Sequence, residues 1–557
     1  MQTYTNPVFE YRRPPELSGS TRHRGVVIVG AGPVGLSAAI DLAQRDIPVL
    51  VLDDDDTVSV GSRAICYAKR TLEILDRLGC GEPVVQRGVG WSVGKIFHGD
   101  HLTYQFDLLP EPGHHRPAFV NLQQYHFEEY LVRRVADLDA AEIRWKHRVV
   151  AVTRDDAQVG LRVATPDGEY ALTCDWLIVC DGARSPVRHL LGLDTEGQVF
   201  HDRFLIADIH MATDFPTERW FWFDPPFHPN QSVLLHRQAD NVWRVDFQLG
   251  WEADPEEEKR PENILPRLRA MLGADVDFAI EWASVYTFQC RRMQKFRHGR
   301  VLFAGDAAHL VSPFGARGAN SGVQDADNLM WKLALVMRGQ APEALLDTYD
   351  AERVAAADEN ILNSTRATDF ITPKSVVSRT FRDAVLALAR HHAFARTLVN
   401  SGRLSVPAIL ADSSLNTPDS RVSNEVDNVA FSGAMVPGAP AADAPVAGPR
   451  GEWLLPYLGG GFVLLTFGDG VSAAAARGLA QDGIPCSIVQ VGGTPCEDRM
   501  VIEDKDGLVA ARYDASAKTC YLVRPDQHVC ARWRTFDPAA VRSALARATA
   551  NAERDIQ

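Results

Sequence analysis

The sequence lacks the features that mark membrane, secreted and nucleic-acid-binding proteins. No apolar run approaches the roughly 20 residues of a membrane-spanning helix, and the first 24 residues contain no apolar core of a secretory signal. Basic residues are in the minority, with 58 Lys and Arg against 72 Asp and Glu and a net charge of −14. A broad basic surface for nucleic acid or an anionic membrane is therefore not expected. We predict a cytoplasmic protein that acts on small molecules.

Cysteine is also scarce and irregularly placed. The chain has nine cysteines with no C-x-x-C pair, which favours reduced thiols over a disulfide framework or a zinc site. No metal site is expected. The chain has 557 residues, 46% hydrophobic and 23% charged, which is enough for two or three globular domains.

A glycine-rich turn marks the start of the first predicted domain. Residues 24–29 form a β-branched run typical of a buried strand, and residues 36–45 form a predicted helix after the turn. The glycines of the turn allow a close approach to a pyrophosphate at the helix N-terminus. A second strand, residues 48–52, leads into a carboxylate at the spacing of a ribose ligand. The unit predicts a dinucleotide site made by Gly30, Gly32, Pro33, Val34, Gly35, Asp53 and Asp54.

Two later motifs each follow a predicted strand and extend this site. Asp181 comes after the strand at 176–179, and Asp306 after the short apolar strand at 301–304. In the loop 312–320, glycines let backbone N–H groups approach a flat ring. A helix from 321 to 337 directs its positive end to the same place, with Asn320 as its expected cap. In this order the motifs narrow the dinucleotide to FAD, with Asp181, Asp306, Pro313, Gly315, Gly318, Ala319 and Asn320 as further candidate ligands.

The order of predicted elements indicates an α/β chain with an inserted sheet. We expect an extension at 1–23, a discontinuous Rossmann-type FAD-binding domain at 24–190 and 296–405, and an antiparallel substrate-binding sheet at 191–295 with segments near 85–120. A linker is expected at 406–450 and a small α/β domain at 451–557. In that last domain, strands are predicted at 462–467, 487–491, 509–513 and 521–523, and a helix at 538–549.

Together the three motifs resemble those of the group A flavoprotein aromatic monooxygenases, of the para-hydroxybenzoate hydroxylase and phenol hydroxylase type. The chain is most similar in organisation to the 3-(3-hydroxyphenyl)propionate hydroxylase-like enzymes, which carry a thioredoxin-like C-terminal domain. The resemblance implies an enzyme of aromatic compound catabolism that uses FAD, O2 and NADH or NADPH to hydroxylate a phenolic substrate through a flavin C4a-hydroperoxide. Loss of a ring substituent would use the same machinery.

The resemblance also assigns individual residues. Arg63 matches an arginine that contacts FAD, and Gln123 matches a glutamine near the flavin, with Gln124 as the alternative register. Tyr286 and Arg291 lie in a segment similar to one in phenol hydroxylase, so Tyr286 is the expected hydrogen-bond partner of the substrate oxygen. Further catalytic candidates are the Pro313 carbonyl and His236, although a core role for Tyr286 and for His236 is the alternative. The chain has Ala64 near the position of a phenol hydroxylase aspartate, which puts activation of the phenol by that route in question.

Two other functions are compatible with the sequence. The aromatic run 220–225 resembles part of a flavin-dependent halogenase signature, although a strand that lines or floors a substrate cavity explains it better. A non-catalytic flavin-binding redox sensor is the third hypothesis. The C-terminal domain is expected to have a packing or dimer-supporting role, because it lacks C-x-x-C. No nucleic acid or membrane partner is expected, and a homodimer is compatible with the sequence.

Overall fold

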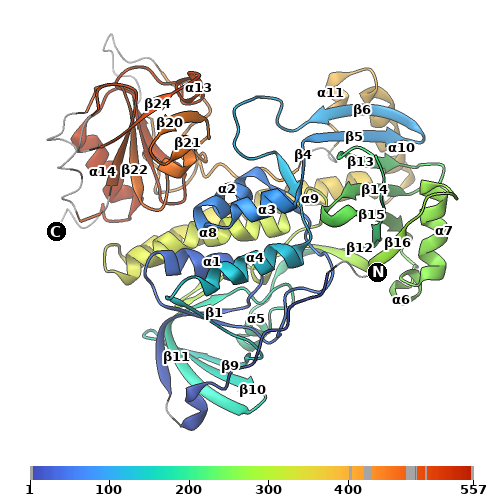
Figure 1. The fold of residues 1–557 in the computed structure, drawn as a ribbon, viewed down its shortest axis with the longest axis horizontal. Helices are drawn as coiled ribbons and strands as arrows, with labels where there is room; N and C mark the ends of the chain where they lie inside the picture. Colours follow the sequence, from blue (N-terminus) through green and yellow to red (C-terminus); the bar gives the residue numbers. More distant parts are fainter. Residues whose placement is uncertain are drawn as a thin grey trace.

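The computed structural model describes residues 4–19, 21–399, 404–419, 430–471, 479, 483–484, 486–495 and 499–552. In Figure 1 a central helical layer lies between a sheet below it, a second sheet on one side and a smaller domain on the other. This arrangement confirms the expected α/β class with an inserted sheet and a separate C-terminal domain. In the described part of the chain, no helix combines the length and apolar character that crossing a bilayer requires.

The first domain is built on an eight-stranded sheet whose centre is parallel. Its path runs β17-β18-β11-β1-β2-β8, and β9 and β10 extend β11 as an antiparallel meander. The strands at the centre are buried on both sides, as their unbroken Val and Ile runs predict. The members are β1 (Arg22–Val29), β2 (Val49–Leu52), β8 (Ala141–Arg144), β9 (Arg148–Arg154), β10 (Val159–Thr165), β11 (Gly168–Val179), β17 (Arg297–His298) and β18 (Val301–Phe303).

Helices cover this sheet and carry the site residues. The hydrophobic core of the domain joins β1, β2 and β11 to the apolar faces of α1, α4 and α8. A small sheet of β3 (Cys66–Ala68), β4 (Val89–Trp91) and β7 (Phe119–Asn121) lies at the border with the second domain. The helices are α1 (Pro33–Gln44), α2 (Lys69–Leu78), α3 (Gly81–Arg87), α4 (Gln124–Ala136), α5 (Pro186–Leu190) and α8 (Gly318–Met337).

The second domain is an eight-stranded sheet in the order β19-β16-β12-β15-β14-β13-β5-β6. It is antiparallel except where β5, from the predicted segment near 85–120, pairs parallel with β13. One face packs under α7, and the other faces the first domain and, at its far end, α10. The strands are β5 (Val93–His98), β6 (His101–Asp107), β12 (Glu196–His210), β13 (Arg219–Phe223), β14 (Ser232–Arg237), β15 (Val242–Leu249), β16 (Ala279–Arg292) and β19 (His309–Leu310); the helices are α6 (Pro255–Glu258), α7 (Pro261–Leu272), α9 (Asp347–Ile371), α10 (Val376–Ala389) and α11 (Ala393–Arg396).

The C-terminal domain has a thioredoxin-like core in which β22 pairs parallel with β23 and antiparallel with β25. Its sheet runs β21-β20-β24-β23-β22-β25-β26. The strand β20 lies inside the segment that we assigned to a linker, and it pairs with β21 and β24. The elements are β20 (Pro445–Gly448), β21 (Gly451–Trp453), β22 (Phe462–Phe467), β23 (Cys486–Val491), β24 (Met500–Asp504), α13 (Leu508–Arg512), β25 (Cys520–Val523), β26 (Val529–Trp533) and α14 (Pro538–Ala548).

One predicted strand of this domain is wrong. Of the predicted strand 509–513, residues 509–512 fall in the helix α13 and Tyr513 follows its end. The Asp504 carboxylate accepts hydrogen bonds from the N–H groups of Val509 and Ala510, at 3.1 and 2.9 Å. These bonds satisfy amides that a helix start leaves without partners, and they favour a helical turn over an extended one.

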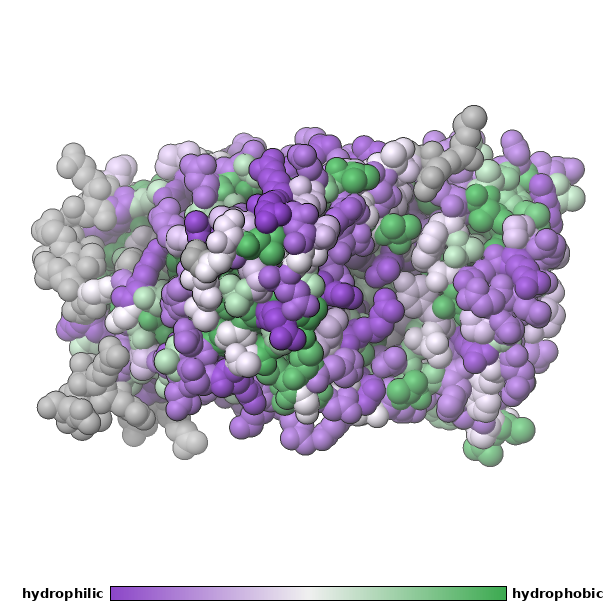
Figure 2. Space-filling view, turned by 90° about the horizontal axis from the view of Figure 1, so that it is seen from below, coloured by the Kyte–Doolittle hydropathy of each residue, from purple (hydrophilic) through white to green (hydrophobic). Residues whose placement is uncertain are grey.

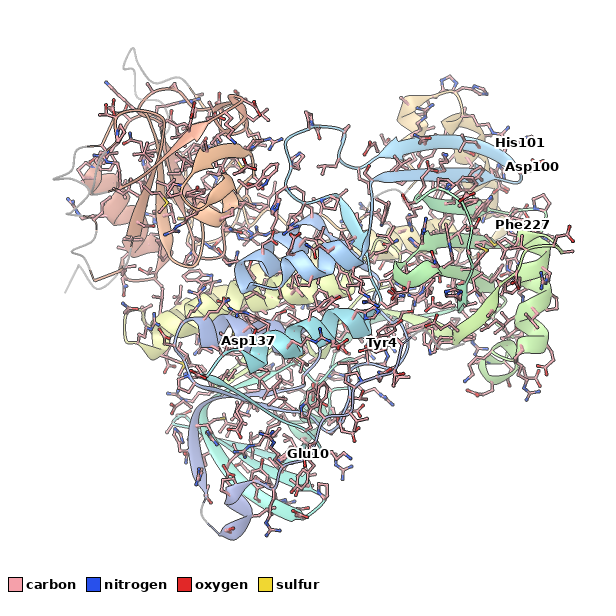
Figure 3. All side chains as sticks on the ribbon, in the orientation of Figure 1. Tyr4, Glu10, Asp100, His101, Asp137 and Phe227 are labelled. Atoms are coloured by element: carbon pink, nitrogen blue, oxygen red, sulfur yellow. The ribbon has the colours of Figure 1, made fainter. Side chains whose placement is uncertain are left out.

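The N-terminal extension packs along the first domain. The Phe9 ring stacks on Trp145 with centroids 4.4 Å apart, and Tyr4 stacks on Tyr125 at 4.2 Å. Figure 3 shows Tyr4 beside the end of α4, where its hydroxyl donates to Glu129 at 2.9 Å. Seen from below, the surface is mainly hydrophilic with separate apolar patches (Figure 2), which agrees with the acidic composition.

Candidate active site

A cavity of about 1350 Å³ runs between the first domain and the sheet of the second. Its walls come from the end of β1, the loops after β2, β11 and β18, the start of α8 and the inner face of the second sheet. All three sequence motifs therefore meet at one place, because parallel strands present their carboxyl ends on the same edge of a sheet.

The three glycines of the turn after β1 have different surroundings. Gly30 has φ +105°, and a Cβ there would lie 2.3 Å from the Cys180 carbonyl oxygen. A Cβ on Gly35 would lie 1.9 Å from the Gly30 carbonyl oxygen, so Gly35 permits close helix packing without lining the cavity. A Cβ on Gly32 would meet no protein atom within 4 Å. Gly32 thus faces space in front of the α1 N-terminus, which suits a phosphate group.

Asp53 stabilises this turn. Its carboxylate accepts hydrogen bonds from the N–H groups of Ala31 at 2.5 Å and of Asp55 at 2.9 Å. Burial raises the pKa of Asp53 to about 6 in spite of these two bonds. The same side chain lines the cavity, so it is placed to receive a ribose hydroxyl.

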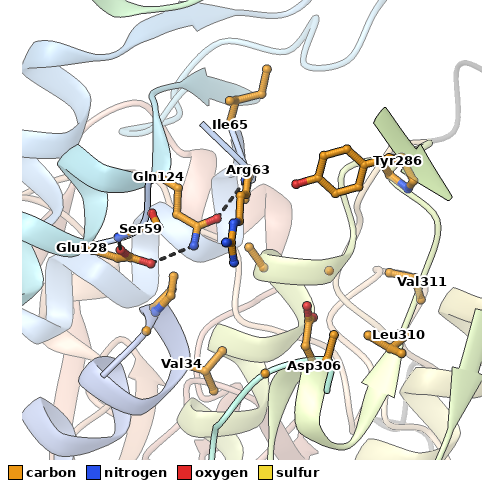
Figure 4. Close-up of a pocket in the computed structure, with 18 of the residues that line it drawn as sticks. Val34, Ser59, Arg63, Ile65, Gln124, Glu128, Tyr286, Asp306, Leu310 and Val311 are labelled. Atoms are coloured by element: carbon orange, nitrogen blue, oxygen red, sulfur yellow. Dashed lines mark hydrogen bonds between the residues drawn. The ribbon is translucent and has the colours of Figure 1, made fainter. Parts of the chain in front are cut away.

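A second polar group faces the same end of the cavity, and the sequence did not reveal it. Glu128 accepts a hydrogen bond from the Gln124 side-chain amide at 2.7 Å and from the Ser59 N–H at 2.5 Å. Gln124 in turn accepts from the Ala64 N–H at 2.9 Å (Figure 4). Gln124 lines the cavity, whereas Gln123 is buried outside it and donates to the Ala239 carbonyl. The structure thus favours the alternative register.

Asp181 lies at the end of β11. One carboxylate oxygen accepts from the Val187 N–H at 3.0 Å, while the other is buried and has no hydrogen-bond partner. Burial raises the pKa of Asp181. An unsatisfied buried oxygen beside a cavity is an acceptor for a ligand hydroxyl.

Asp306 and Arg63 face the middle of the cavity from opposite sides. Figure 4 shows both side chains directed into the pocket, with the Tyr286 hydroxyl pointing toward Arg63. Asp306 is exposed to the cavity, and desolvation by the surrounding protein raises its pKa. Gly318 and Ala319, at the start of α8, line the cavity beside it, so the positive end of the helix dipole is turned to this region.

Asn320 does not cap α8, contrary to our expectation. The helix begins at Gly318, and Asn320 lies in its first turn. The Asn320 side chain accepts from the Ala68 N–H at 2.8 Å and from the Thr71 hydroxyl at 2.7 Å, and it donates to the Cys66 carbonyl at 2.9 Å. Tertiary contacts thus use its polar atoms to join α8 to β3, which outweighs the local capping preference.

A buried ion network supports the loop that presents Asp306. The Asp325 carboxylate accepts from the Gly305 N–H at 2.9 Å, from His309 at 2.6 Å and from Arg353 at 2.6 Å. Burial alone would raise the pKa of Asp325, but His309 and Arg353 outweigh it and lower the pKa. Asp325 therefore positions the turn at Gly305, and His309 has a structural place in this network.

Of the four residues that we expected to contact the substrate, three line the cavity and one does not. Tyr286, His236 and Pro313 line the cavity. Arg291 does not, because it lies near the end of β16 and donates to the Thr195 carbonyl at 2.5 Å. Burial raises the pKa of Tyr286 and lowers that of His236 well below its usual range, so both side chains are neutral near pH 7.

Residues 220–223 of the aromatic run belong to β13 and alternate between the two faces of the sheet. Trp222 packs in the cluster on the far face of the sheet under α7, with Trp220 against its edge, whereas Phe221 and Phe223 belong to the cluster on the inner face. Arg219 of this strand lines the cavity, but neither tryptophan does. None of residues 220–225 lines the cavity, so the segment has a packing role on the two faces of the sheet rather than the cavity-lining role that we expected.

The cavity brings together most of the predicted site residues. Those that line it are Gly30, Gly32, Pro33, Val34, Asp53, Asp54, Arg63, Asp181, His236, Tyr286, Asp306, Pro313, Gly318, Ala319 and Asn320; Gly35, Gln123, Arg291 and Gly315 do not line it. Gln124, the alternative register, also lines the cavity, and further polar lining residues escaped the sequence analysis, among them Glu128, Arg219, Arg244 and Asp246. Arg219 and Asp246 lie on ordinary strands, and alternation alone could have placed them on one face but not beside a ligand.

Comparison with known proteins agrees with this geometry. Residues 24–364 match the family model described as FAD binding domain. A 3-(3-hydroxy-phenyl)propionate/3-hydroxycinnamic acid hydroxylase of Mycolicibacterium smegmatis is 30% identical over 65% of this chain and 64% of its own length. The corresponding Escherichia coli enzyme is 31% identical over 67% of each chain. Para-nitrophenol 4-monooxygenase of a Pseudomonas species is 32% identical over 59% of this chain and 82% of its own.

Solved structures show the same fold. The flavin-dependent monooxygenase PieE, solved in complex with FAD and substrate, superposes with a TM-score of 0.79 at 23% identity, over 95% of this chain and 99% of its own. Aklavinone-11 hydroxylase, solved with FAD and aklavinone, gives 0.75 at 24% identity, over 95% and 100%. The space at Gly32, the unpartnered Asp181 oxygen and the cavity-facing Asp306 suit the pyrophosphate and hydroxyl groups of such a dinucleotide.

Proposed function

The chain belongs to the family of FAD-dependent aromatic hydroxylases, and from this premise we propose that it is an NAD(P)H- and O2-dependent monooxygenase that hydroxylates a phenolic ring. One observation supports this proposal above the others. A single cavity joins the cofactor motifs to a sheet wall that carries Tyr286. A ring held against that wall would lie beside the cofactor's reactive end.

When bound, FAD supplies the redox and oxygen chemistry that protein side chains lack. We assign the pyrophosphate to Gly30, Gly32 and the α1 N-terminus, and ribose or ribitol hydroxyls to Asp53 and Asp306. Arg63 is assigned to the flavin. These assignments follow from the placement of each group along the cavity.

The protein's own contribution at the substrate is orientation and the exclusion of water. The Tyr286 hydroxyl keeps its proton because burial raises its pKa, so it can donate a hydrogen bond to a phenolate oxygen. Pro313 lines the same region, and its carbonyl, which already accepts from the Ala316 N–H at 3.0 Å, has a second lone pair for the hydroxyl of a neutral phenol. Phe204, Phe288 and Phe314 form an aromatic cluster there, with ring centroids 5.0–5.1 Å apart.

The test is a substrate screen with the purified, FAD-loaded protein. We expect a phenol to stimulate NADH or NADPH oxidation and to gain one oxygen atom, measured by mass spectrometry with ¹⁸O2. Replacement of a nitro, halide or carboxylate substituent by oxygen would appear in the same product spectra. A chloride-dependent product formed only with a separate flavin reductase would support a halogenase. Bound FAD without any phenol-stimulated oxidation would support a redox sensor.

Tyr286→Phe separates binding of the cofactor from handling of the substrate. We expect this variant to keep its FAD and to hydroxylate about 10–100-fold more slowly, because one hydrogen bond to the developing charge is lost. Tyr170→Phe is a control, since its hydroxyl lies outside the cavity, near Arg144 at 3.5 Å. Wild-type turnover by the Tyr286 variant would remove this residue from the site.

A further inference from the structure

The loop 108–118, between β6 and β7, leads from the second domain back to the first and passes the C-terminal domain on its way. In Figure 1 it lies between β6 and the C-terminal domain. The loop contains neither helix nor strand, so a fixed position depends on contacts with neighbouring elements. These contacts come largely from the C-terminal domain.

Arg512 of α13 holds the tip of this loop. Its guanidinium donates to the carbonyls of Pro112 and Gly113, each at 2.7 Å, and lies 3.4 Å from Nε2 of His114. Burial lowers the pKa of His114 to about 4, so this ring is neutral near pH 7 and can accept a hydrogen bond. The same guanidinium donates to the Asp443 carbonyl of its own domain. One arginine thus ties the loop to the C-terminal domain.

Two close packing contacts complete this attachment. His115 stacks on Trp453 of β21, with ring centroids 5.1 Å apart and planes 23° from parallel. Gly113 has φ +78°, and a Cβ there would lie 2.6 Å from Cδ1 of Leu508 and 3.3 Å from Cδ of Pro445. The loop therefore approaches the domain so closely that no side chain fits at position 113.

The first residues of the loop lie directly behind the cavity wall. Leu108 and Leu109 pack against a hydrophobic cluster that includes Trp91 and Leu404. Both of these cluster residues line the cavity. The Trp91 ring lies 6.2 Å from the ring of His236, so this part of the wall adjoins the second sheet. A displaced loop would leave this part of the wall without support.

The C-terminal domain also holds the chain that follows Leu404. The Thr417 N–H donates to the carbonyl of Cys530 on β26 at 2.8 Å. Asp419 forms an ion pair with Arg532 of the same strand at 2.6 Å. Two segments that support the same part of the cavity wall, one from the second domain and one from the end of the first, are thus attached to the C-terminal domain.

Resting on the proposed function, we propose that the C-terminal domain closes the substrate end of the cavity to bulk water, with Arg512 as the positioning residue that fixes the loop 108–118 behind the wall. Arg512 does not line the cavity, so it acts through the two leucines at the start of the loop. Closure matters because hydroxylation of a ring requires a site from which water is excluded. This gives a role to a domain that lacks the C-x-x-C pair of a dithiol enzyme.

Alkylation of Cys66 by N-ethylmaleimide in the FAD-loaded protein measures closure without any substrate. Cys66 lines the cavity and packs against the same cluster as the two leucines, and burial raises the pKa of its thiol to about 12. In Arg512→Gln we expect labelling about tenfold or more faster than in wild type, because charge-assisted bonds to two carbonyls are lost. Cys180, which lines the cavity directly after β11, is the internal reference and should keep its rate. Equal Cys66 labelling in variant and wild type would overturn the proposal.

Two further arginine variants separate this contact from the general effect of a lost charge. Arg512→Lys should label at an intermediate rate, because lysine keeps the charge but not the forked geometry. Arg547→Gln is the matched control, since Arg547 is exposed on α14, on the side of the domain away from the loop (Figure 1). Faster Cys66 labelling in Arg547→Gln, equal to that in Arg512→Gln, would refute the role of the loop contact.

Gly113→Ala tests the same contact from the side of the loop, and it leaves the C-terminal domain intact if Arg512→Gln does not fold. Its methyl group would push the tip of the loop away from Leu508, so Cys66 labelling should again be faster. Gly99→Ala is the matched control, because Gly99 also has a positive φ, +62°, at the β5–β6 turn, and a Cβ there meets no atom within 4 Å. Equal labelling in the two glycine variants would count against the proposal.

Turnover shows whether closure serves the reaction. With a phenol that is hydroxylated, Arg512→Gln and Gly113→Ala should keep their FAD, and KM and the share of NAD(P)H electrons that reduce O2 to H2O2 should each rise about threefold or more. A loss of folded protein alone would lower the rate but leave both quantities unchanged. Wild-type KM and peroxide yield in a variant with faster Cys66 labelling would overturn the proposed closure. If no phenol stimulates NAD(P)H oxidation, only the proposed function fails, because the labelling rates need no substrate.

Discussion

Removing Arg524 should release the C-terminal domain from the body of the protein. The Arg524 side chain is fully buried and donates to Glu352 of α9 at 2.6 and 3.1 Å. It also binds Asp526 of its own domain, at 2.5 and 3.0 Å. Lys332 of α8 contacts the same Glu352 at 2.7 Å. The arginine is thus the cationic centre of a cluster that spans the domain interface.

In Arg524→Met, two buried carboxylates lose their principal cation. Loss of one partner of a buried ion pair costs about 3–5 kcal/mol. At about 1.4 kcal/mol per factor of ten, the open population should rise by about two to four powers of ten. Because α8 carries Lys332 and begins at the cofactor-binding loop, we also expect weaker retention of FAD.

Native-state hydrogen exchange measures this directly. Amides of β25 and β26 should exchange faster by about the same factor, if the interface limits their opening. Lys505→Met is the matched control, since Lys505 and Glu452 form an ion pair with side chains 42% and 79% exposed, and such pairs contribute about 0–1 kcal/mol. Protection in Arg524→Met within tenfold of wild type would show that the cluster does not hold the domain, and would refute this reasoning.

Three other perturbations address the cofactor site. Asp306→Ala should purify with little FAD, measured as flavin absorbance per protein; a full complement would exclude a role in binding. Gly32→Ala should fold normally, because its methyl group meets no protein atom, but it should bind FAD more weakly because the methyl group enters the space assigned to the pyrophosphate. Gly30→Ala, in contrast, should lower the melting temperature, because its Cβ would lie 2.3 Å from the Cys180 carbonyl oxygen. In the apoprotein, burial raises the pKa of Asp53 to about 6, so the folded state binds its proton more tightly than the unfolded state does. The free energy of unfolding should therefore fall as the pH rises from about 4 to about 6. Urea titrations of Asp53→Asn should lack this contribution, and equal pH profiles of the variant and the wild type would contradict it.

Local patterns were sufficient for the cofactor-binding framework. The turn at Gly30, the strand before it and the helix after it are specified within about 20 consecutive residues, and Asp181 and Asp306 each end a recognisable apolar strand. Parallel strands align their carboxyl ends, so the meeting of these motifs in one cavity followed from chain order alone. The family resemblance rested on the same short segments.

Side-chain hydrogen bonds explain two places where the sequence analysis was wrong. Residues 509–512 belong to a helix because the Asp504 carboxylate accepts hydrogen bonds from the first amides of the turn. Asn320 bonds to β3 instead of capping α8. Propensity describes which conformations a residue favours in isolation, and its hydrogen-bond partners in the fold select among them.

By itself, the sequence determined the cofactor class and the order of the domains, because both depend on short segments whose chemistry is local. Only the tertiary structure decided the substrate wall. Arg219, His236, Arg244 and Asp246 come from three strands, and their neighbours are set by sheet register and by the domain packed against them. A shift of one residue in any of these strands would turn its side chains to the opposite face, and no local pattern encodes the register to that accuracy.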